Sequence, residues 1–392
     1  MEPDLSAVDE RLAEFEADGY LLDADGTDPN QQYLSGFDAP DPFVTLYAGE
    51  THLLFVRSLE FGRAKREARA DTVERFVDFD YDRLREEHDR REAAARVRAT
   101  FLREHDVEHV AVPPRFPTGT ADALREQNIE VTVDHDDAIE TARATKTAAE
   151  IDHIRTAQRA NEAAMAAAEG LIRGAAVDDE GRLLAEGEVL TSELVREEIE
   201  VTLLRNGCAL DETIVACGAD AADPHDRGSG PLVADEPIIV DIFPQDKDSK
   251  YHADMTRTFL VGEPDETVEE WFELTDQARK AAIDAVEPGV TGAEVHDIVC
   301  DVYEDAGLPT LRSDGSAETG FIHSTGHGVG LAVHEQPSVS QRGGELEPGH
   351  IITIEPGLYD PAVGGVRIED LLVVTDDGAE NLTEYPVALT GE

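Results

Sequence analysis

Lysine is scarce in this 392-residue chain, and acidic residues far outnumber basic ones. Five lysines and 28 arginines, 33 basic residues in all, face 86 acidic residues, so the formal net charge at pH 7 is −53. A surface of this sign repels the phosphates of nucleic acids and the head groups of anionic lipids. We therefore expect neither a nucleic acid nor a membrane among the partners of this protein.

The acidity has two competing explanations. An acidic patch for a basic partner would form a local run, whereas adaptation to molar salt, in which charges are screened within roughly 3 Å, would affect the whole surface. The acidic residues are spread from Glu2 to Glu392. Their even spread and the scarcity of lysine favour a protein adapted to a halophilic organism.

Cysteine and long apolar runs are also rare. The three cysteines (Cys208, Cys217 and Cys300) form no Cys-x-x-Cys pair, which excludes a four-thiolate zinc site, and their odd number argues against a disulfide framework. No apolar run approaches the roughly 20 residues of a membrane span, and the acidic N-terminus lacks the apolar segment of a secretory signal. We expect a cytoplasmic protein.

The length of the chain and its apolar content of 41% are sufficient for two domains. In residues 1–140, short apolar runs alternate with amphipathic charged stretches, which predicts an α/β domain. The predicted strands are Gly19–Asp23, His52–Arg57, Val107–Pro113 and Glu130–Asp134, and the predicted helices are Asp82–His105 and Ala121–Gln127. Residues 134–145 are polar and carry little pattern, so we place the domain boundary there.

Residues 146–392 differ in character and predict an α+β domain. Helices are expected at Thr147–Ile172, Thr191–Asn206, Asp265–Val286 and Gly292–Ala306. Two β-rich segments resemble each other: EPIIVDIFP followed by YHADMTRTFLV, and PGHIITIEPG followed by GGVRIEDLLVV. Each segment predicts an antiparallel hairpin, so we expect an internal pseudo-twofold repeat.

Each predicted hairpin carries two carboxylates within apolar strand sequence. Asp241 and Asp254 belong to the first hairpin, and Glu355 and Glu369 belong to the second. Pairing across each hairpin, together with the repeat, can bring all four to one place. Four half-buried negative charges need compensation, which two divalent cations supply as +4 against −4. The pattern predicts a dinuclear metal site.

Histidines gather between and before the two hairpins. His323, His327 and His334 lie in FIHSTGHGVGLAVHEQP, and His225 lies in DPHDRGSG. Four carboxylates with one imidazole suit Mn²⁺ or Co²⁺, with Fe²⁺ and Zn²⁺ as alternatives. Paired divalent ions activate water for attack on a carbonyl group. The residues therefore indicate metal-assisted hydrolysis.

The run VDIFP…HADMTRTF…HSTGHGVGLAVHE…ITIEPGLY…GGVRIED resembles the pita-bread metallopeptidases of peptidase family M24, in their X-Pro aminopeptidase and prolidase branch. The resemblance covers about residues 146–392, and residues 1–140 resemble the creatinase-type N-terminal domain of the family. It implies a pita-bread catalytic domain and a homodimer. It also implies that the metal ligands are Asp241, Asp254, His327, Glu355 and Glu369.

The same resemblance implies individual roles. Asp254 and Glu369 would bridge the two ions, and Glu355 would also shuttle protons for a hydroxide held between them. Four further residues would serve the substrate or the ligands: His225 as donor to the tetrahedral oxyanion, His334 as contact of the substrate carbonyl, His323 in the substrate pocket, and Arg367 as the residue that orients Glu369.

The implied activity is hydrolysis of the bond between an N-terminal residue and a following proline, in a dipeptide or a longer peptide. Two other interpretations stay open: a creatinase-like hydrolase or a lyase on the same scaffold, and a pita-bread binding module. Members of those kinds lose metal ligands, whereas this chain has a ligand-type residue at all five positions.

The net charge predicts that the stability of the protein depends on salt. Lowering the ionic strength from molar to about 0.1 M lengthens the Debye length from roughly 3 to 10 Å, so the acidic residues repel one another more strongly. We expect the melting temperature, measured by calorimetry in KCl, to fall as salt is removed. A melting temperature that stays flat between about 0.1 and 3 M KCl would contradict the halophilic interpretation and favour a local acidic binding surface.

Overall fold

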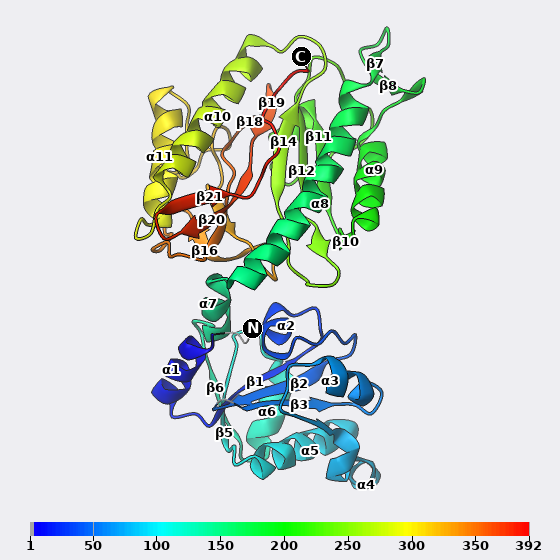
Figure 1. Ribbon diagram of the computed structural model, residues 1–392, viewed down its shortest axis with the longest axis vertical. Helices are drawn as coiled ribbons and strands as arrows, with labels where there is room; N and C mark the ends of the chain where they lie inside the picture. Colours follow the sequence, from blue (N-terminus) through cyan, green and yellow to red (C-terminus); the bar gives the residue numbers. More distant parts are fainter. Residues whose placement is uncertain (1–3, 50, 392) are drawn as a thin grey trace. The chain divides into compact units, whose positions relative to one another are not determined.

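The computed structural model describes residues 4–49 and 51–391, which form two compact units (Figure 1). One unit ends at Arg143 and the other begins at Ala144. Among the described residues, no helix is long and apolar enough to cross a membrane.

The N-terminal unit contains a six-stranded mixed sheet with helices around it, which confirms the predicted α/β class. The strand order is β4-β3-β2-β1-β5-β6, in which β1, β2 and β3 pair antiparallel and the outer pairs are parallel. The strands are β1 (Gly19–Ala24), β2 (Phe43–Ala48), β3 (Thr51–Val56), β4 (Thr72–Arg75), β5 (His109–Val112) and β6 (Glu130–Val133). The helices are α1 (Ser6–Phe15), α2 (Pro29–Ser35), α3 (Phe61–Glu67), α4 (Tyr81–Glu87), α5 (Arg90–Glu104), α6 (Thr118–Glu126) and α7 (Ala138–Ala144), and the 3-10 turn η1 covers Phe76–Phe79.

One expectation for this unit was wrong, and one helix was not predicted. The predicted helix Asp82–His105 is two helices, because the extended backbone of His88 ends the first. The Asp89 side chain accepts a hydrogen bond from the Glu92 N–H and caps the second. The unpredicted helix is α7, which lies in the polar stretch 134–145. There the buried carboxylate of Asp134 accepts the N–H of Ala138 at 2.7 Å and satisfies the start of the helix.

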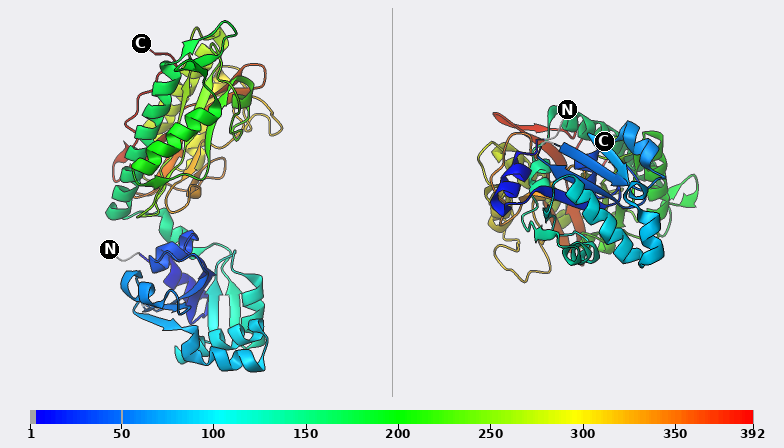
Figure 2. Two further views of the ribbon diagram at one scale, coloured as in Figure 1. Left: turned by 90° about the vertical axis from the view of Figure 1, so that its right-hand side faces the viewer. Right: turned by 90° about the horizontal axis from the view of Figure 1, so that it is seen from below.

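The C-terminal unit consists of two halves with the same plan, a pair of helices followed by an antiparallel sheet. The first half has α8 (Ala148–Arg173) and α9 (Ser192–Arg205), which run side by side in Figures 1 and 2, and the sheet β11-β12-β14. The second half has α10 (Glu266–Ala285), α11 (Gly292–Asp305) and the sheet β16-β15-β17-β20-β21. This repetition is the expected internal pseudo-twofold repeat of a pita-bread domain.

The strands of the first sheet are β11 (Thr213–Cys217), β12 (Ile238–Ile242) and β14 (Met255–Phe259). Those of the second are β15 (Gly326–Gly328), β16 (Glu335–Val339), β17 (Ile351–Ile354), β20 (Asp370–Thr375) and β21 (Gly378–Asn381). The shorter elements are β7 (Ala176–Val177), β8 (Leu183–Ala185), β9 (Glu188–Val189), β10 (Cys208–Ala209), β13 (Gln245–Asp246), β18 (Gly357–Asp360), β19 (Gly364–Arg367) and the 3-10 turn η2 (Gly218–Ala222).

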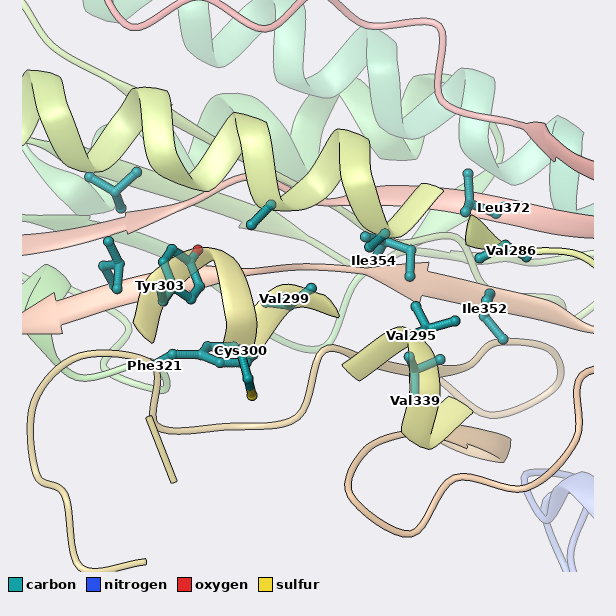
Figure 3. Close-up of a cluster of buried hydrophobic side chains, with 14 of the residues drawn as sticks. Val286, Val295, Val299, Cys300, Tyr303, Phe321, Val339, Ile352, Ile354 and Leu372 are labelled. Atoms are coloured by element: carbon teal, nitrogen blue, oxygen red, sulfur yellow. The ribbon is translucent and has the colours of Figure 1, made fainter. Parts of the chain in front are cut away.

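The four helices predicted for this unit are all present and begin where capping residues place them. Thr147 and Thr291 form capping boxes with Glu150 and Glu294, and Thr191 caps α9. The helices then bury apolar faces against the sheets in two separate cores. Figure 3 shows part of the second core, in which side chains of α11 such as Val295 lie beside the side chains of β17.

Candidate functional site

A cavity of about 870 Å³ opens in the C-terminal unit and is lined by residues of both halves. The four carboxylates singled out in the sequence line it, and so do the four histidines. Its apolar wall includes Ile214, Phe243, Ile322 and Val333.

The alternation of side chains along β12 explains why an aspartate faces the cavity. Val240 and Ile242 belong to the core beneath α8 and α9, so Asp241 between them points to the opposite face. In the antiparallel register Asp241 lies opposite Thr256. Asp254, two residues before Thr256, therefore lies diagonally from Asp241 on the same face of the hairpin.

The second pair of carboxylates lies at a break in a long hairpin. β17 pairs with β20 and β18 pairs with β19 in one continuous register, and Glu355 and Glu369 lie opposite each other between the two ladders. Their N–H groups donate to acceptors outside the hairpin. The Glu355 N–H donates to Thr325 O at 2.8 Å, and the Glu369 N–H donates to Thr256 O at 3.0 Å. The second bond joins the two half-sheets where the carboxylates meet.

His327 reaches this point from β15 because glycines flank it. A Cβ atom on Gly326 would lie 1.9 Å from Thr353 O, so a larger residue would push the strand away. The His327 Nε2 atom is 3.4 Å from Glu355 Oε1 and 3.8 Å from Asp254 Oδ2. The imidazole thus lies among the carboxylates.

The hydrogen bonds of His327 fix the state of its ring. Its Nδ1 atom is 3.1 Å from the Gly328 carbonyl oxygen, which only accepts, so Nδ1 carries the proton and donates. Burial lowers the pKa of His327 to about 3, with the His334 ring adding to the effect. The ring is therefore neutral, and the lone pair of Nε2 faces the carboxylates.

The donor atoms of three of these residues converge on one point of the cavity. Asp254, His327 and Glu369 each offer an atom within 4.8 Å of the others. Among the described residues, Asp241 Oδ1 is buried without a hydrogen-bond partner. Burial and the neighbouring carboxylates raise the pKa of Asp254 and Glu369, and burial raises the pKa of Glu355 to about 8. Oxygen donors of this kind, with one neutral imidazole, fit divalent cations.

Arg367 supports the carboxylates from outside the cluster. Its Nη2 atom donates to Asp241 Oδ2 at 2.7 Å, and its Nε atom donates to Thr256 Oγ1 at 3.2 Å. Thr256 Oγ1 in turn donates to Glu369 Oε2 at 2.8 Å. The guanidinium therefore contacts Asp241 directly and reaches Glu369 through Thr256, whereas the resemblance implied only the orientation of Glu369.

The other three candidate histidines line the cavity in different ways. His334 is exposed on the wall, and its ring centroid lies 4.1 Å from that of His327. His225 is exposed on the loop before β12, where its N–H donates to Asp223 Oδ1. His323 is half-buried, and its Nε2 atom is 2.9 Å from the Tyr359 hydroxyl. The His323 Nδ1 atom is 2.7 Å from the Ser324 carbonyl oxygen, which only accepts, and burial lowers the pKa of His323 to about 3. Nδ1 therefore carries the proton of a neutral ring, and the Tyr359 hydroxyl donates to Nε2 while it accepts from Arg367 Nη1.

Three side chains that support the site were not singled out from the sequence. Thr256 contacts Glu369, Thr353 accepts the His327 N–H and contacts Glu355, and Tyr359 links Arg367 to His323. The first two stand two residues from Asp254 and Glu355 along a strand. The period of two that places side chains on one face would have identified both.

Similarity to known proteins was found over nearly the whole chain. Residues 152–376 match metallopeptidase family M24, and residues 5–145 match the creatinase/prolidase N-terminal domain. An Xaa-Pro dipeptidase of Pyrococcus horikoshii is 31% identical over 364 residues, which cover 91% of this chain and 90% of that protein. An Xaa-Pro dipeptidase of Pyrococcus furiosus is likewise 31% identical over 363 residues, covering 91% of each.

Solved structures agree with the sequence match. The crystal structure of the prolidase from Pyrococcus horikoshii OT3 aligns with a TM-score of 0.79 and 28% identity, covering 98% of this chain and 99% of that one. The Xaa-Pro dipeptidase from Bacillus anthracis aligns with a TM-score of 0.81 at 24% identity, covering 98% of each chain, which supports the fold. With a converging carboxylate and imidazole cluster in a pita-bread domain, the chain belongs to metallopeptidase family M24.

Proposed function

We propose that this protein is a metal-dependent exopeptidase that cleaves the bond between an N-terminal residue and proline, as an Xaa-Pro dipeptidase. The observation that carries the proposal is the convergence of Asp254, His327 and Glu369, with Asp241 and Glu355 beside them, in one cavity. The similarity to Xaa-Pro dipeptidases along nine-tenths of the chain supports the choice of substrate. The complete set of ligand-type residues argues against the creatinase-like and binding-module alternatives.

The proposed ligands of two divalent ions are Asp241, Asp254, His327, Glu355 and Glu369, with Mn²⁺ or Co²⁺ as the proposed metal. When bound, the ions supply Lewis-acid polarisation of the scissile carbonyl and an activated water nucleophile. Membership of the metallopeptidase family supports the divalent ions, and the oxygen-rich donor set supports the choice of metal.

Glu355 is proposed to move the proton that the reaction requires. The proline nitrogen carries no hydrogen in the peptide bond, so it must gain a proton to leave as an amine. The Glu355 carboxylate lines the cavity beside the other carboxylates, where it would accept a proton from the water nucleophile and pass it to the leaving nitrogen. Its position beside His327 places that proton at the centre of the cluster.

The histidines outside the cluster are proposed to bind the substrate. His225 would donate to the oxyanion that forms at the attacked carbonyl, and His334 would contact the substrate carbonyl from the wall beside His327. His323 would line the pocket, held by its bond with Tyr359. The apolar side chains of the wall, Phe243 among them, would receive the proline ring.

The proposal also covers the organisation of the protein. Residues 1–140 would form the creatinase-type domain and residues 146–392 the catalytic domain. We propose that the protein is a cytoplasmic homodimer and that it is adapted to high salt. The net charge of −53 supports the adaptation to high salt. Products formed from X-Pro, X-Pro-Y and longer peptides would distinguish a dipeptidase from an aminopeptidase.

Metal should be required for activity and should stabilise the protein in a pH-dependent manner. The raised pKa of Glu355 means that, between about pH 4.5 and pH 8, the metal-free folded protein holds a proton that the unfolded chain has lost. The stability of the metal-free protein therefore falls as the pH rises through this range. Cations displace such protons, so the rise in melting temperature on adding Mn²⁺ should be larger at about pH 8 than at about pH 5.5.

The measurement pairs calorimetry with an X-Pro dipeptide assay of chelated and Mn²⁺-loaded protein at fixed high salt. Chelation should abolish hydrolysis and Mn²⁺ or Co²⁺ should restore it. Full activity in protein that elemental analysis shows to be metal-free would contradict the mechanism.

Substitution of two histidines should separate a ligand from an oxyanion donor. His327→Ala should lose bound metal and activity together. His225→Ala should retain the metal content of the wild type but lower kcat by on the order of 10²–10³, because the donor acts mainly in the transition state. Elemental analysis and kcat of both variants check the assignment. Loss of metal in His225→Ala, or unchanged kcat, would show that the assigned role is wrong.

A further inference from the structure

A buried ion pair lies beneath the loop that carries His334. The Lys146 ammonium is 2.7 Å from Glu335 Oε1, and the two side chains are 1% and 2% exposed. Lys146 is one of five lysines in a chain that otherwise uses arginine for its positive charges. Lysine and glutamate are rarely so deeply buried, and removal of either partner is costly because it takes the opposite charge away from the other.

The carboxylate of Glu335 forms the interior of a tight turn. Its Oε2 atom accepts the N–H of Ala332 at 3.3 Å, and the Gly330 N–H donates to Ala332 O at 3.0 Å. A Cβ atom on Gly330 would lie 2.1 Å from Glu335 Oε1, so the turn closes around the carboxylate only because residue 330 is glycine. The carboxylate therefore determines the path of residues 330–335.

Lys146 is itself held in place by the main chain. Its ammonium donates to Ala144 O at 3.1 Å, and its N–H donates to Gly349 O at 2.9 Å. The next residue, Thr147, caps α8. The lysine thus projects from a fixed point, at the start of a 26-residue helix, into the turn around Glu335.

We propose that Lys146 is a positioning residue for His334, acting through Glu335. His334 directly precedes Glu335, and its exposed ring packs at 4.1 Å, between centroids, on the ring of His327. The ion pair fixes the position of the peptide group between His334 and Glu335. It thereby sets the direction in which the His334 imidazole points into the cavity. The inference rests on the proposed function, in which His334 contacts the substrate carbonyl.

Removing the ammonium should displace His334. In Lys146→Met the carboxylate of Glu335 is buried without its cation, so it turns towards water and opens the turn. A displacement of about 1 Å in a group that orients substrate can lower the rate by on the order of 10²-fold, so we expect kcat on an X-Pro dipeptide to fall by roughly 10- to 100-fold. Metal content should stay at the wild-type level, because the five proposed ligands are untouched.

Replacing both charged residues with neutral ones should restore the position of His334. In Lys146→Met/Glu335→Gln no buried charge is left unpaired, and the amide oxygen can still accept the Ala332 N–H. We expect most of kcat to return in this double variant. Arg98→Met is the control: it breaks the half-buried pair of Arg98 with Asp23 in the N-terminal unit, so it should lower the melting temperature while kcat stays unchanged.

A double-mutant cycle with His334→Ala provides the decisive test. If Lys146 acts through His334, Lys146→Met should lower kcat in the wild type but should have little further effect in His334→Ala. An equal loss in both backgrounds, or a fall in melting temperature with kcat unchanged, would overturn the inference. Glu335→Gln supplies the same cycle if Lys146→Met does not fold. Wild-type protein that cleaves no X-Pro peptide would instead contradict the proposed function.

Discussion

Mutual repulsion of carboxylates in a buried site is the constraint on which the rest of this structure depends. Asp241, Asp254 and Glu369 are each less than a tenth exposed, and Glu355 lies beside them. Burial and the neighbouring negative charges raise the pKa of Asp254 and Glu369, so protons partly relieve the repulsion in the absence of a cation. A fold that gathers these groups must hold them against that repulsion.

The two halves of the pita-bread domain provide the restraint. Each half packs a pair of helices on one face of an antiparallel sheet, which leaves the other face for the carboxylates. The hairpin of the second half breaks at Glu355 and Glu369, and the freed N–H groups bond to neighbouring segments. Arg367 contributes a positive charge at Asp241, and Arg257, which is 2% exposed, donates to the main-chain oxygen of Glu369 at 2.6 Å. Backbone and guanidinium bonds thus hold these carboxylates in place.

Much of this organisation follows from patterns within short stretches of sequence. The capping residues Thr147, Thr191 and Thr291 predict where three helices start, and carboxylates within apolar runs predict the hairpins that carry the site. The break at Asp89 was missed because its charged surroundings continue a helical pattern on both sides. The strand β2 was missed although its residues, FVTLYA, are mostly the apolar, aromatic and β-branched residues typical of a buried strand. The four-residue strand β4 was missed because its pairing with β3, rather than a local pattern, defines it.

Long-range contacts explain what the sequence did not reveal about the site. The bond between Arg367 and Asp241 joins residues 126 positions apart, and no local pattern predicts it. The pair of Lys146 and Glu335 is likewise set by the packing of the segment before α8 on the second half of the domain. Such contacts depend on how the two halves meet, which a strand or helix period does not encode.

An anomalous difference map from crystals grown with Mn²⁺ would show whether the cavity binds two divalent ions. The proposed mechanism predicts two peaks in the cavity, with Asp254 and Glu369 contacting both ions and with His327 and Asp241 on different ions. It would be contradicted by a map in which the carboxylates contact no ion, or in which Mn²⁺ binds away from His327, in crystals whose protein hydrolyses X-Pro peptides.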